Sequence, residues 1–218
     1  IADILFNNNF DLDQFQYLVN DTFVSKNINL GYLRENKSHT DFIPRTAWTT
    51  CIEPSKQYQI INTIADGNAN YFAIDILQEV KYGNIIFDIY GPKEDEDYWL
   101  ICENNAKLLP NNISFNYKSV LKPEEICTTM NQYHALFLPT QTENFGHVIV
   151  EALKNGRLVV ISDQTPWRHL QNEYAGFDIS LNDKAKFIEA IGMLINLNQS
   201  EFDAMSKTCI SFINHQLN

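Results

Sequence analysis

The sequence predicts an α/β fold, namely a Rossmann-like, doubly wound parallel sheet of about six strands preceded by a short irregular N-terminal region. From residue 58 onward, short apolar runs of strand length alternate with segments of helical periodicity. The runs are almost continuously apolar, as in strands that helices cover on both faces. The chain before residue 58 is rich in Asn and Asp. We therefore divide it into 1–57, a partial N-terminal domain or lead-in segment, and 58–218, the Rossmann-like domain.

Each strand is predicted from one apolar run. In chain order the runs are 59–64, 85–90, 113–115, 135–138, 158–161 and 177–179. In the usual order of such a sheet, the direction of winding reverses between the first and fourth strands. Ligands bind at the carboxyl ends of the strands beside that point.

The segments between the runs are predicted to be helices. They are 71–80, 96–108, 123–133, 147–154, 166–172, 184–197 and 199–215. The acidic run at 94–97 suits the start of a helix, where negative charge interacts favourably with the dipole. A cation site in that run is the weaker alternative, and we predict no metal site.

Composition excludes several classes of partner. The formal charge of −11 argues against nucleic acid or an anionic membrane surface, and no apolar run is long enough to span a bilayer. The cysteines, Cys51, Cys102, Cys127 and Cys209, are far apart and form no C-x-x-C pair. This spacing favours free thiols in a reducing compartment. We expect a cytoplasmic protein, with peripheral attachment to the inner face of the membrane as an alternative.

Two common phosphate-binding motifs are missing from the sequence. No G-x-G-x-x-G follows the first strand, where residues 65–70 read ADGNAN, and no G-x-x-x-x-G-K-[ST] occurs anywhere. A dinucleotide cofactor and a P-loop are therefore not expected. We predict that the protein uses no cofactor.

The segment 137–153, FLPTQTENFGHVIVEAL, carries the most specific chemistry. It runs from the fourth strand through a polar loop into a helix. Gly146 at the helix entrance permits close approach to the backbone, and the first amides of the helix have no intrahelical partners. This entrance predicts a phosphate site. Glu143 precedes it and Glu151 follows within the helix, so one carboxylate can reach a sugar and the other a ribose.

These residues resemble the retaining glycosyltransferases of family 4, whose GT-B C-terminal domains carry an E-x7-E motif between a strand and a helix. Glu143 and Glu151 have that spacing. Residues 151–161 look like the family's E-A-x-x-x-G-x-P-V-I, with Arg157 and Leu158 in place of a small residue and proline. Residues 162–168 and 87–92 are also similar to family segments, so the resemblance covers roughly residues 58–205.

The resemblance implies a role for each part of the motif. Glu143 would be the catalytic candidate at the donor sugar, and Glu151 would bind the ribose hydroxyls. The implied donor-binding residues are Thr140, Asn144, Phe145, Gly146, His147, Glu151, Lys118 and Arg168. The reaction would transfer a hexose, with retention, from a nucleoside-diphosphate sugar to a glycan or glycolipid acceptor in surface polysaccharide biosynthesis. The leaving group would be stabilised without an obligatory metal.

The sequence departs from the family in the loop after the first strand. The family places an Arg there and a Lys about five residues later, and these cations hold the leaving diphosphate. Thr63 and Asn68 align with them, and Asp66 adds a negative charge. Lys118 and Arg168 are the candidates to compensate.

Three functions therefore stay open. The first is a glycosyltransferase whose acceptor site belongs to an N-terminal half, so that this chain alone binds nucleotide without transferring sugar. The second is a degenerate, non-catalytic module that acts in scaffolding or partner binding. The third and weakest is a sugar-nucleotide epimerase.

Overall fold

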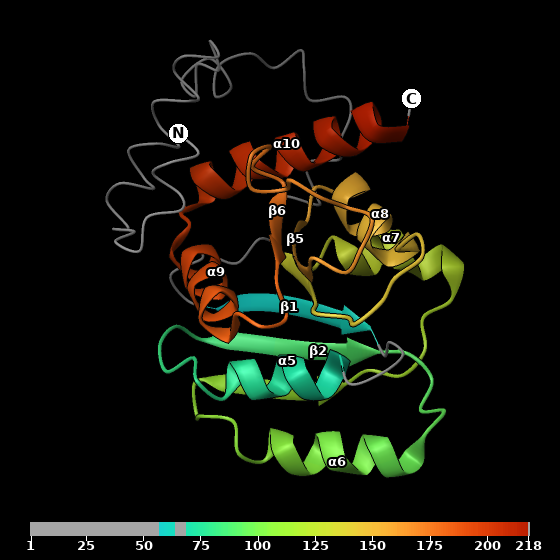
Figure 1. Ribbon diagram of the computed structural model, residues 1–218, viewed down its shortest axis with the longest axis vertical. Coiled ribbons are helices and arrows are strands. Elements are labelled where there is room, and N and C mark those ends of the chain that lie inside the picture. The colour runs from blue at the N-terminus through green and yellow to red at the C-terminus, as the bar shows by residue number, and fades with distance from the viewer. Residues whose placement is uncertain (1–56, 64–68, 218) are drawn as a thin grey trace. The chain divides into compact units, whose positions relative to one another are not determined.

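The computed structural model describes residues 57–63 and 69–217, and these residues form a six-stranded sheet with helices on both faces (Figure 1). The strands are β1 (Tyr58–Thr63), β2 (Ile85–Tyr90), β3 (Ile113–Tyr117), β4 (Ala135–Leu138), β5 (Leu158–Ser162) and β6 (Gly176–Ile179). The helices are α5 (Ala69–Leu77), α6 (Glu96–Ala106), η2 (Pro123–Glu125), α7 (Ile126–Met130), α8 (His147–Lys154), α9 (Lys184–Asn196) and α10 (Gln199–Leu217).

The sheet has the strand order of a doubly wound fold. Neighbouring strands run β3-β2-β1-β4-β5-β6, and every pair is parallel. The predicted fold class is therefore confirmed. Strand β1 lies between β2 and β4, so the winding reverses at the β1–β4 pair, as predicted. Because β1 and β4 are parallel, their carboxyl ends lie at the same edge of the sheet.

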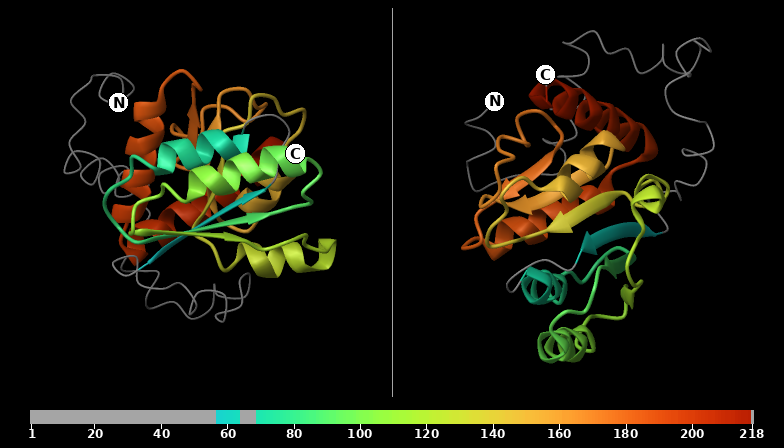
Figure 2. Two further views of the ribbon diagram at one scale, coloured as in Figure 1. Left: turned by 90° about the horizontal axis from the view of Figure 1, so that it is seen from below. Right: turned by 90° about the vertical axis from the view of Figure 1, so that its right-hand side faces the viewer.

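The helices form two layers. Helices α5, α6 and α9 pack on one face of the sheet, and α7, α8 and α10 pack on the other (Figure 2). All residues of β4 and β5 are buried, which explains their continuously apolar sequences. Phe137 of β4 joins the core, with its ring centroid 6.3 Å from that of Phe87 and 6.1 Å from that of Phe187 in α9.

Helix α6 begins where the acidic run predicted it. Asp95 is the N-cap, and its side chain accepts a hydrogen bond from the backbone N–H of Tyr98 at 2.8 Å. Glu96 and Asp97 occupy the first turn, where negative charge favours the positive end of the helix dipole. This run therefore acts as a helix start.

The helix predicted at 166–172 is wrong. That segment is an irregular loop in which His169 has a φ of 63°, and Tyr174 just beyond it has a φ of 53°. The buried carboxylate of Asp178 in β6 accepts hydrogen bonds from the backbone N–H groups of His169 and Leu170, at 3.2 and 2.9 Å. These contacts to the following strand take the place of helical hydrogen bonds.

The predicted helix 123–133 is shorter than expected, because only η2 and α7 are helical there. Of the predicted segment 1–57, the structure describes Gln57 alone. Asp66 and Asn68 lie outside the described residues. Within the described ranges, no helix combines the length and the apolar character needed to cross a membrane.

Candidate functional site

The entrance of α8 opens beside the point where the winding reverses. Its N-cap is Gly146, which has a left-handed backbone with φ 77° and ψ 55°. This backbone conformation favours glycine, and a Cβ atom there would also lie 2.9 Å from Cδ1 of Ile149 and 3.1 Å from Nε1 of Trp167. Gly146 has no side chain that could cap α8. The first amides within the helix therefore have no hydrogen-bond acceptor in a side chain of their N-cap residue, an arrangement that suits an anion.

Glu143 lies at this entrance. Its Oε1 atom accepts a hydrogen bond from the backbone N–H of Gly146 at 3.0 Å, and its Cγ lies close to the glycine. The carboxylate is half-buried and sits at the positive end of the helix. The structure thus brings the predicted catalytic residue to the predicted phosphate site.

The carbonyl group of Phe145, in the peptide unit that also contains the Gly146 N–H, accepts a hydrogen bond from Trp167. The indole Nε1 of Trp167 donates to this oxygen at 2.6 Å, and the two rings meet edge to face with centroids 5.7 Å apart. Trp167 is buried, whereas Phe145 is 43% exposed and lies 4.8 Å from the ring of His147. Phe145 and His147 therefore form an exposed aromatic wall at the entrance.

Glu151 lies one helical turn after His147, on the same side of α8. It is partly buried, and burial raises the pKa of its carboxyl group above the usual value. The nearby positive charges of His147 and Lys154 act in the opposite direction. Asn144, in the loop before the helix, is exposed. The entrance thus gathers most of the predicted donor-binding residues.

Thr140 has a structural position beneath the loop. It is 1% exposed, and its hydroxyl donates to the carbonyl oxygen of Thr142 at 2.8 Å. Its own carbonyl oxygen accepts a hydrogen bond from the hydroxyl of Ser162 at the end of β5. Thr140 therefore fixes the path of the loop between β4 and α8.

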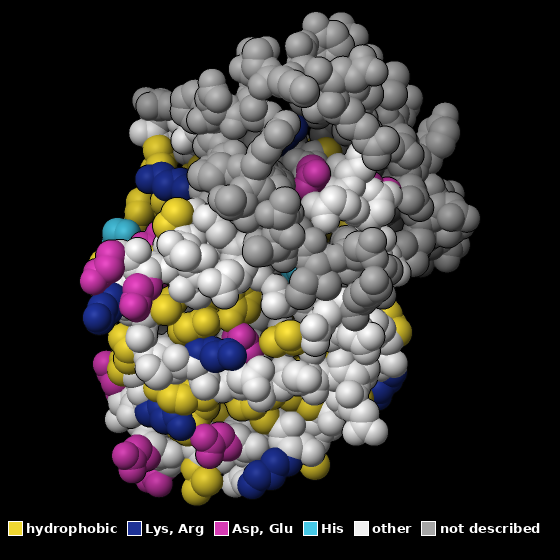
Figure 3. Space-filling model, turned by 180° about the vertical axis from the view of Figure 1, so that it is seen from behind, with side chains coloured by type: hydrophobic (Ala, Val, Ile, Leu, Met, Phe, Trp, Pro, Cys, Tyr) yellow, Lys and Arg dark blue, Asp and Glu magenta, His cyan; other side chains and the backbone are white. Residues whose placement is uncertain are grey.

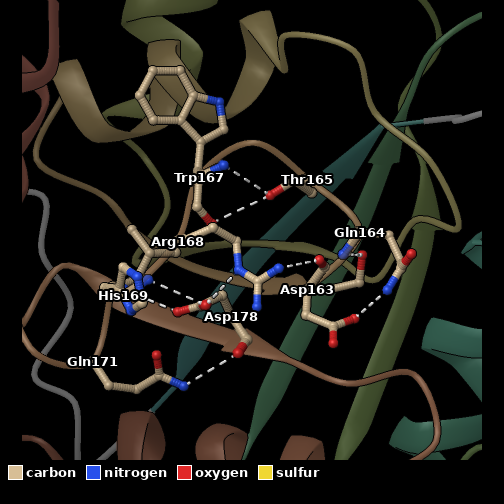
Figure 4. A network of polar contacts seen from close by, with 10 residues as sticks. Asp163, Gln164, Thr165, Trp167, Arg168, His169, Gln171 and Asp178 are labelled. Atoms are coloured by element: carbon tan, nitrogen blue, oxygen red, sulfur yellow. Dashed lines mark hydrogen bonds and ion pairs between the residues drawn. The ribbon is translucent and has the colours of Figure 1, made fainter.

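The two cations expected to compensate for the missing charges already have partners. Nζ of Lys118 lies 3.5 Å from the buried carboxylate of Asp88. Nε of Arg168 donates to Asp178 at 3.1 Å, and its Nη1 donates to the carbonyl oxygen of Asp163 at 2.6 Å (Figure 4). Both cations are thereby oriented by structural contacts.

Thr63, at the end of β1, brings no charge to the site. Its backbone N–H donates to the side-chain oxygen of Asn62 at 2.6 Å, and its carbonyl oxygen accepts from the amide of Asn70 at 3.0 Å. On the face of the molecule shown in Figure 3, Lys and Arg side chains are interspersed with Asp and Glu and do not gather in one patch.

Sequence reasoning missed a buried polar cluster around Asp88. Its carboxylate accepts hydrogen bonds from the hydroxyl of Tyr133 at 2.6 Å and from the amide of Asn116 at 2.8 Å. Burial and this carboxylate raise the pKa of Tyr133 far above its usual value. An aspartate in the middle of an apolar strand is a visible signal. Its partners come from β3 and from the segment just before β4, so the sequence could not identify them.

A depression of about 540 Å³ lies between α6 and β3. It is lined by Glu103, Ala106, Lys107, Leu109, Pro110, Asn111, Ile113 and Phe115, none of which was predicted as a site residue. Strands β2 and β1 separate β3 from β4 and the α8 entrance. In the part of the chain that the structure describes, no group of three or more His, Cys, Asp or Glu side chains is arranged to hold a metal ion.

Comparison with known proteins agrees with the resemblance seen in the sequence. Residues 71–208 match the family described as "Glycosyl transferases group 1". The matched region contains α8 and both glutamates but begins after Thr63. No curated protein sequence gives a significant match.

Solved structures share the fold at low sequence identity. The C-terminal domain of the group 1 glycosyl transferase LpcC from Francisella tularensis has a TM-score of 0.59 and 15% identity, covering 81% of this chain and 94% of that one. WaaG, a glycosyltransferase involved in lipopolysaccharide biosynthesis, has a TM-score of 0.58 and 14% identity over 72% of this chain and 43% of its own.

A third similar structure is the E. coli trehalose-6-phosphate structure bound with UDP-2-fluoro glucose. It has a TM-score of 0.58 and 10% identity, over 82% of this chain and 45% of that one. The matches to WaaG and to this structure span less than half of those chains. Together the three likenesses confirm the predicted fold of a GT-B C-terminal domain.

Proposed function

Because this chain belongs to the glycosyl transferases group 1 family, we propose that its described residues form the donor-binding half of a retaining glycosyltransferase. The donor is a nucleoside-diphosphate sugar, the transferred group is a hexose, and the acceptor is a glycan or glycolipid. The reaction serves surface polysaccharide biosynthesis, in the cytoplasm or at the inner face of the membrane. Residues outside the described domain supply the acceptor site, so this chain alone binds nucleotide and does not transfer sugar.

The observation that carries the proposal is the uncapped entrance of α8 with Glu143 bound to it. An anion at a helix N-terminus gains about 0.3–1 kcal/mol from the dipole, and up to about 2 kcal/mol where the site is partly buried. Each hydrogen bond to a charged oxygen adds about 1.5–3 kcal/mol. The backbone amides that follow Gly146 can bind a phosphate group even where no Lys or Arg side chain contacts that phosphate.

The proposed roles follow from the positions along the loop and helix. The amides of His147 and Val148, the first two residues of α8, bind the diphosphate, and Glu151, farther along α8, binds the ribose. Glu143 lies at the end of the site that faces the sugar. As the bond from the anomeric carbon to the phosphate oxygen breaks, negative charge grows on the leaving diphosphate, and the helix entrance stabilises it. The acceptor hydroxyl then attacks the same face of the sugar, its oxygen bonds to the anomeric carbon, and its proton passes to the departing phosphate oxygen.

A degenerate, non-catalytic module is the second candidate function. The observation that favours it is the shortage of free positive charge, since Thr63 is neutral and both Lys118 and Arg168 are paired with buried carboxylates. Two missing charge-assisted hydrogen bonds correspond to about 1.5–3 kcal/mol each. A loss of that size would weaken nucleotide binding by about 100-fold at the lower end of this range and about 10⁴-fold at the upper end.

Ligand-observed NMR distinguishes the two candidates. The chain is mixed with UDP, GDP, ADP and their common sugar conjugates, and the series is repeated with Glu151→Ala. The proposal predicts that one nucleotide binds and that its binding weakens in the variant. If a demonstrably folded protein binds none of them, the second candidate replaces the first.

A further inference from the structure

The peptide unit between Phe145 and Gly146 is held at both ends. Its carbonyl oxygen accepts from the indole of Trp167, and its N–H donates to Glu143. The position a Cβ would take on Gly146 lies 3.1 Å from Nε1 of Trp167 and 3.3 Å from Cγ of Glu143. The indole, the glycine and the carboxylate side chain therefore form one close-packed group.

A peptide beside glycine can rotate between two orientations at little steric cost, because glycine has no Cβ. Rotation of this peptide would turn its carbonyl oxygen toward Glu143 and its N–H toward the indole. Two hydrogen bonds would be lost, and a negative dipole would face the anion site. The hydrogen bond from Trp167 selects the orientation in which the N–H faces Glu143.

Trp167 is itself held in place by the loop after β5. Its backbone N–H lies 3.3 Å from Oγ1 of Thr165, which accepts the hydrogen bond. The next residues are tied to Asp178, through the guanidinium of Arg168 and the backbone N–H of His169. Figure 4 shows that the indole points away from Asp178, while the side chain of Arg168 turns toward it. Asp178 in β6 thus anchors the loop that carries Trp167, and the loop in turn positions the indole.

We propose that Trp167 is a positioning residue, which fixes the 145–146 peptide so that Glu143 and the α8 entrance keep the geometry needed for donor binding. The importance of that geometry for a reaction rests on the proposed function. The orientation of the peptide itself does not depend on it. Trp167 does not touch the reacting atoms and acts through the backbone of Phe145.

The test compares Trp167→Phe with Trp99→Phe. The first variant keeps a buried aromatic ring and loses the indole N–H. Trp99 is a matched control because it is also buried and its indole also donates a hydrogen bond, to Glu103 in α6, away from the site. The readout is the backbone amide of Gly146 in ¹H–¹⁵N spectra of the full chain. Its hydrogen-exchange rate reports the contact with Glu143.

We expect Trp167→Phe to speed exchange of the Gly146 amide about tenfold or more, as for loss of one hydrogen bond. Trp99→Phe should leave the exchange rate unchanged. UDP, GDP or ADP, whichever binds the wild-type chain, should bind Trp167→Phe about tenfold more weakly. The inference is overturned if the Gly146 amide behaves alike in the wild type and in Trp167→Phe.

The outcomes separate this inference from the proposed function. If no nucleotide binds but Gly146 responds as expected, the positioning role stands and the donor site fails. If Trp167→Phe does not fold, the wild-type indole N–H is measured, after assignment by Trp48→Phe and Trp99→Phe. A protection factor for that N–H, relative to its own intrinsic exchange rate, equal to that of the Gly146 amide supports the inference, and unprotected exchange of the indole refutes it.

Discussion

The carboxylate of Glu143 accepts a hydrogen bond from the backbone N–H of Gly146, 3.0 Å away, at the entrance of α8. The residue predicted to act on the donor sugar therefore interacts with the same helix end that is predicted to bind the diphosphate. In the absence of ligand it supplies the negative charge that the helix N-terminus favours. A phosphate group arriving there must share this end of the helix with a carboxylate of like charge.

Glu143→Gln should therefore raise the affinity for free nucleotides and lower the stability of the fold. The amide retains an acceptor for Gly146 but removes the like charge, so the affinity for UDP, GDP or ADP should rise about two- to fivefold. Unfolding free energy should fall by about 0.3–1 kcal/mol, because the dipole loses its anion. Calorimetric titration and urea unfolding measure the two effects. Weaker nucleotide binding in Glu143→Gln would contradict this view of the entrance.

Gly146→Ala should damage both the fold and the site. The residue has a φ of 77°, and an added Cβ would lie 2.9 Å from Cδ1 of Ile149. We expect about 1–3 kcal/mol of lost stability in urea unfolding, from the strained backbone, and loss of nucleotide binding. Gly83→Ala is the control, since Gly83 has a φ of 70° and its Cβ would press on Ile195, far from α8. It should lose stability and keep nucleotide affinity; equal losses of affinity would refute a specific role for Gly146.

The pH dependence of stability should have opposite signs for Glu151 and Glu103. Burial raises the pKa of Glu151 in the folded state, so its stabilising effect relative to Glu151→Gln is greatest below the unfolded pKa and falls as pH rises through the raised value. Hydrogen bonds from Trp99 and Lys93 lower the pKa of Glu103. Its contribution relative to Glu103→Gln is present above the unfolded pKa and is lost as pH falls through the lowered value.

Urea unfolding of the wild type and both variants between about pH 3 and pH 7 measures these differences, across the range in which carboxyl groups titrate. The wild type should lose stability relative to Glu151→Gln as pH rises, and gain stability relative to Glu103→Gln. Parallel curves for the two pairs would show that the two carboxylates have similar surroundings, contrary to the structure.

Restoring positive charge after β1 should distinguish a weakened donor site from a different phosphate-binding arrangement. Thr63→Arg combined with Asn68→Lys introduces the two cations that the family carries in this loop. Two charge-assisted hydrogen bonds of about 1.5–3 kcal/mol each predict a gain in nucleotide affinity of about 100-fold or more. Leu100→Arg combined with Leu108→Lys adds the same two charges at exposed positions away from α8 and is the control. No gain would mean that the phosphates bind away from this loop.

The sequence predicted the sheet well because its strands are marked by burial on both faces. Strands β2 and β4 begin and end where expected, and the bounds of β1, β5 and β6 differ by one residue. Strand β3 extends to Tyr117, two residues beyond the prediction. It is an edge strand with an alternating pattern of exposure, so its polar Asn116 hid its continuation.

The candidate site was predictable where its chemistry is local in sequence. Gly146, Glu143 and the helix entrance lie within one segment, and the structure places them together. The parts that failed depend on contacts between distant segments. Hydrogen bonds to Asp178 stabilise a loop where a helix was expected. That loop brings Trp167 to Phe145, 22 residues earlier in the chain. No periodicity in residues 166–172 reveals an acceptor that lies in the next strand.

The central claim, that the α8 entrance binds the donor diphosphate, is tested most directly by ¹H–¹⁵N spectra recorded during titration with UDP, GDP and ADP. The account predicts that one nucleotide produces its largest saturating shifts at the amides of Gly146, His147 and Val148. Nucleotide binding that leaves these amides unchanged, with shifts at the depression between α6 and β3 instead, would contradict it. So would the absence of any saturating shift in a folded chain.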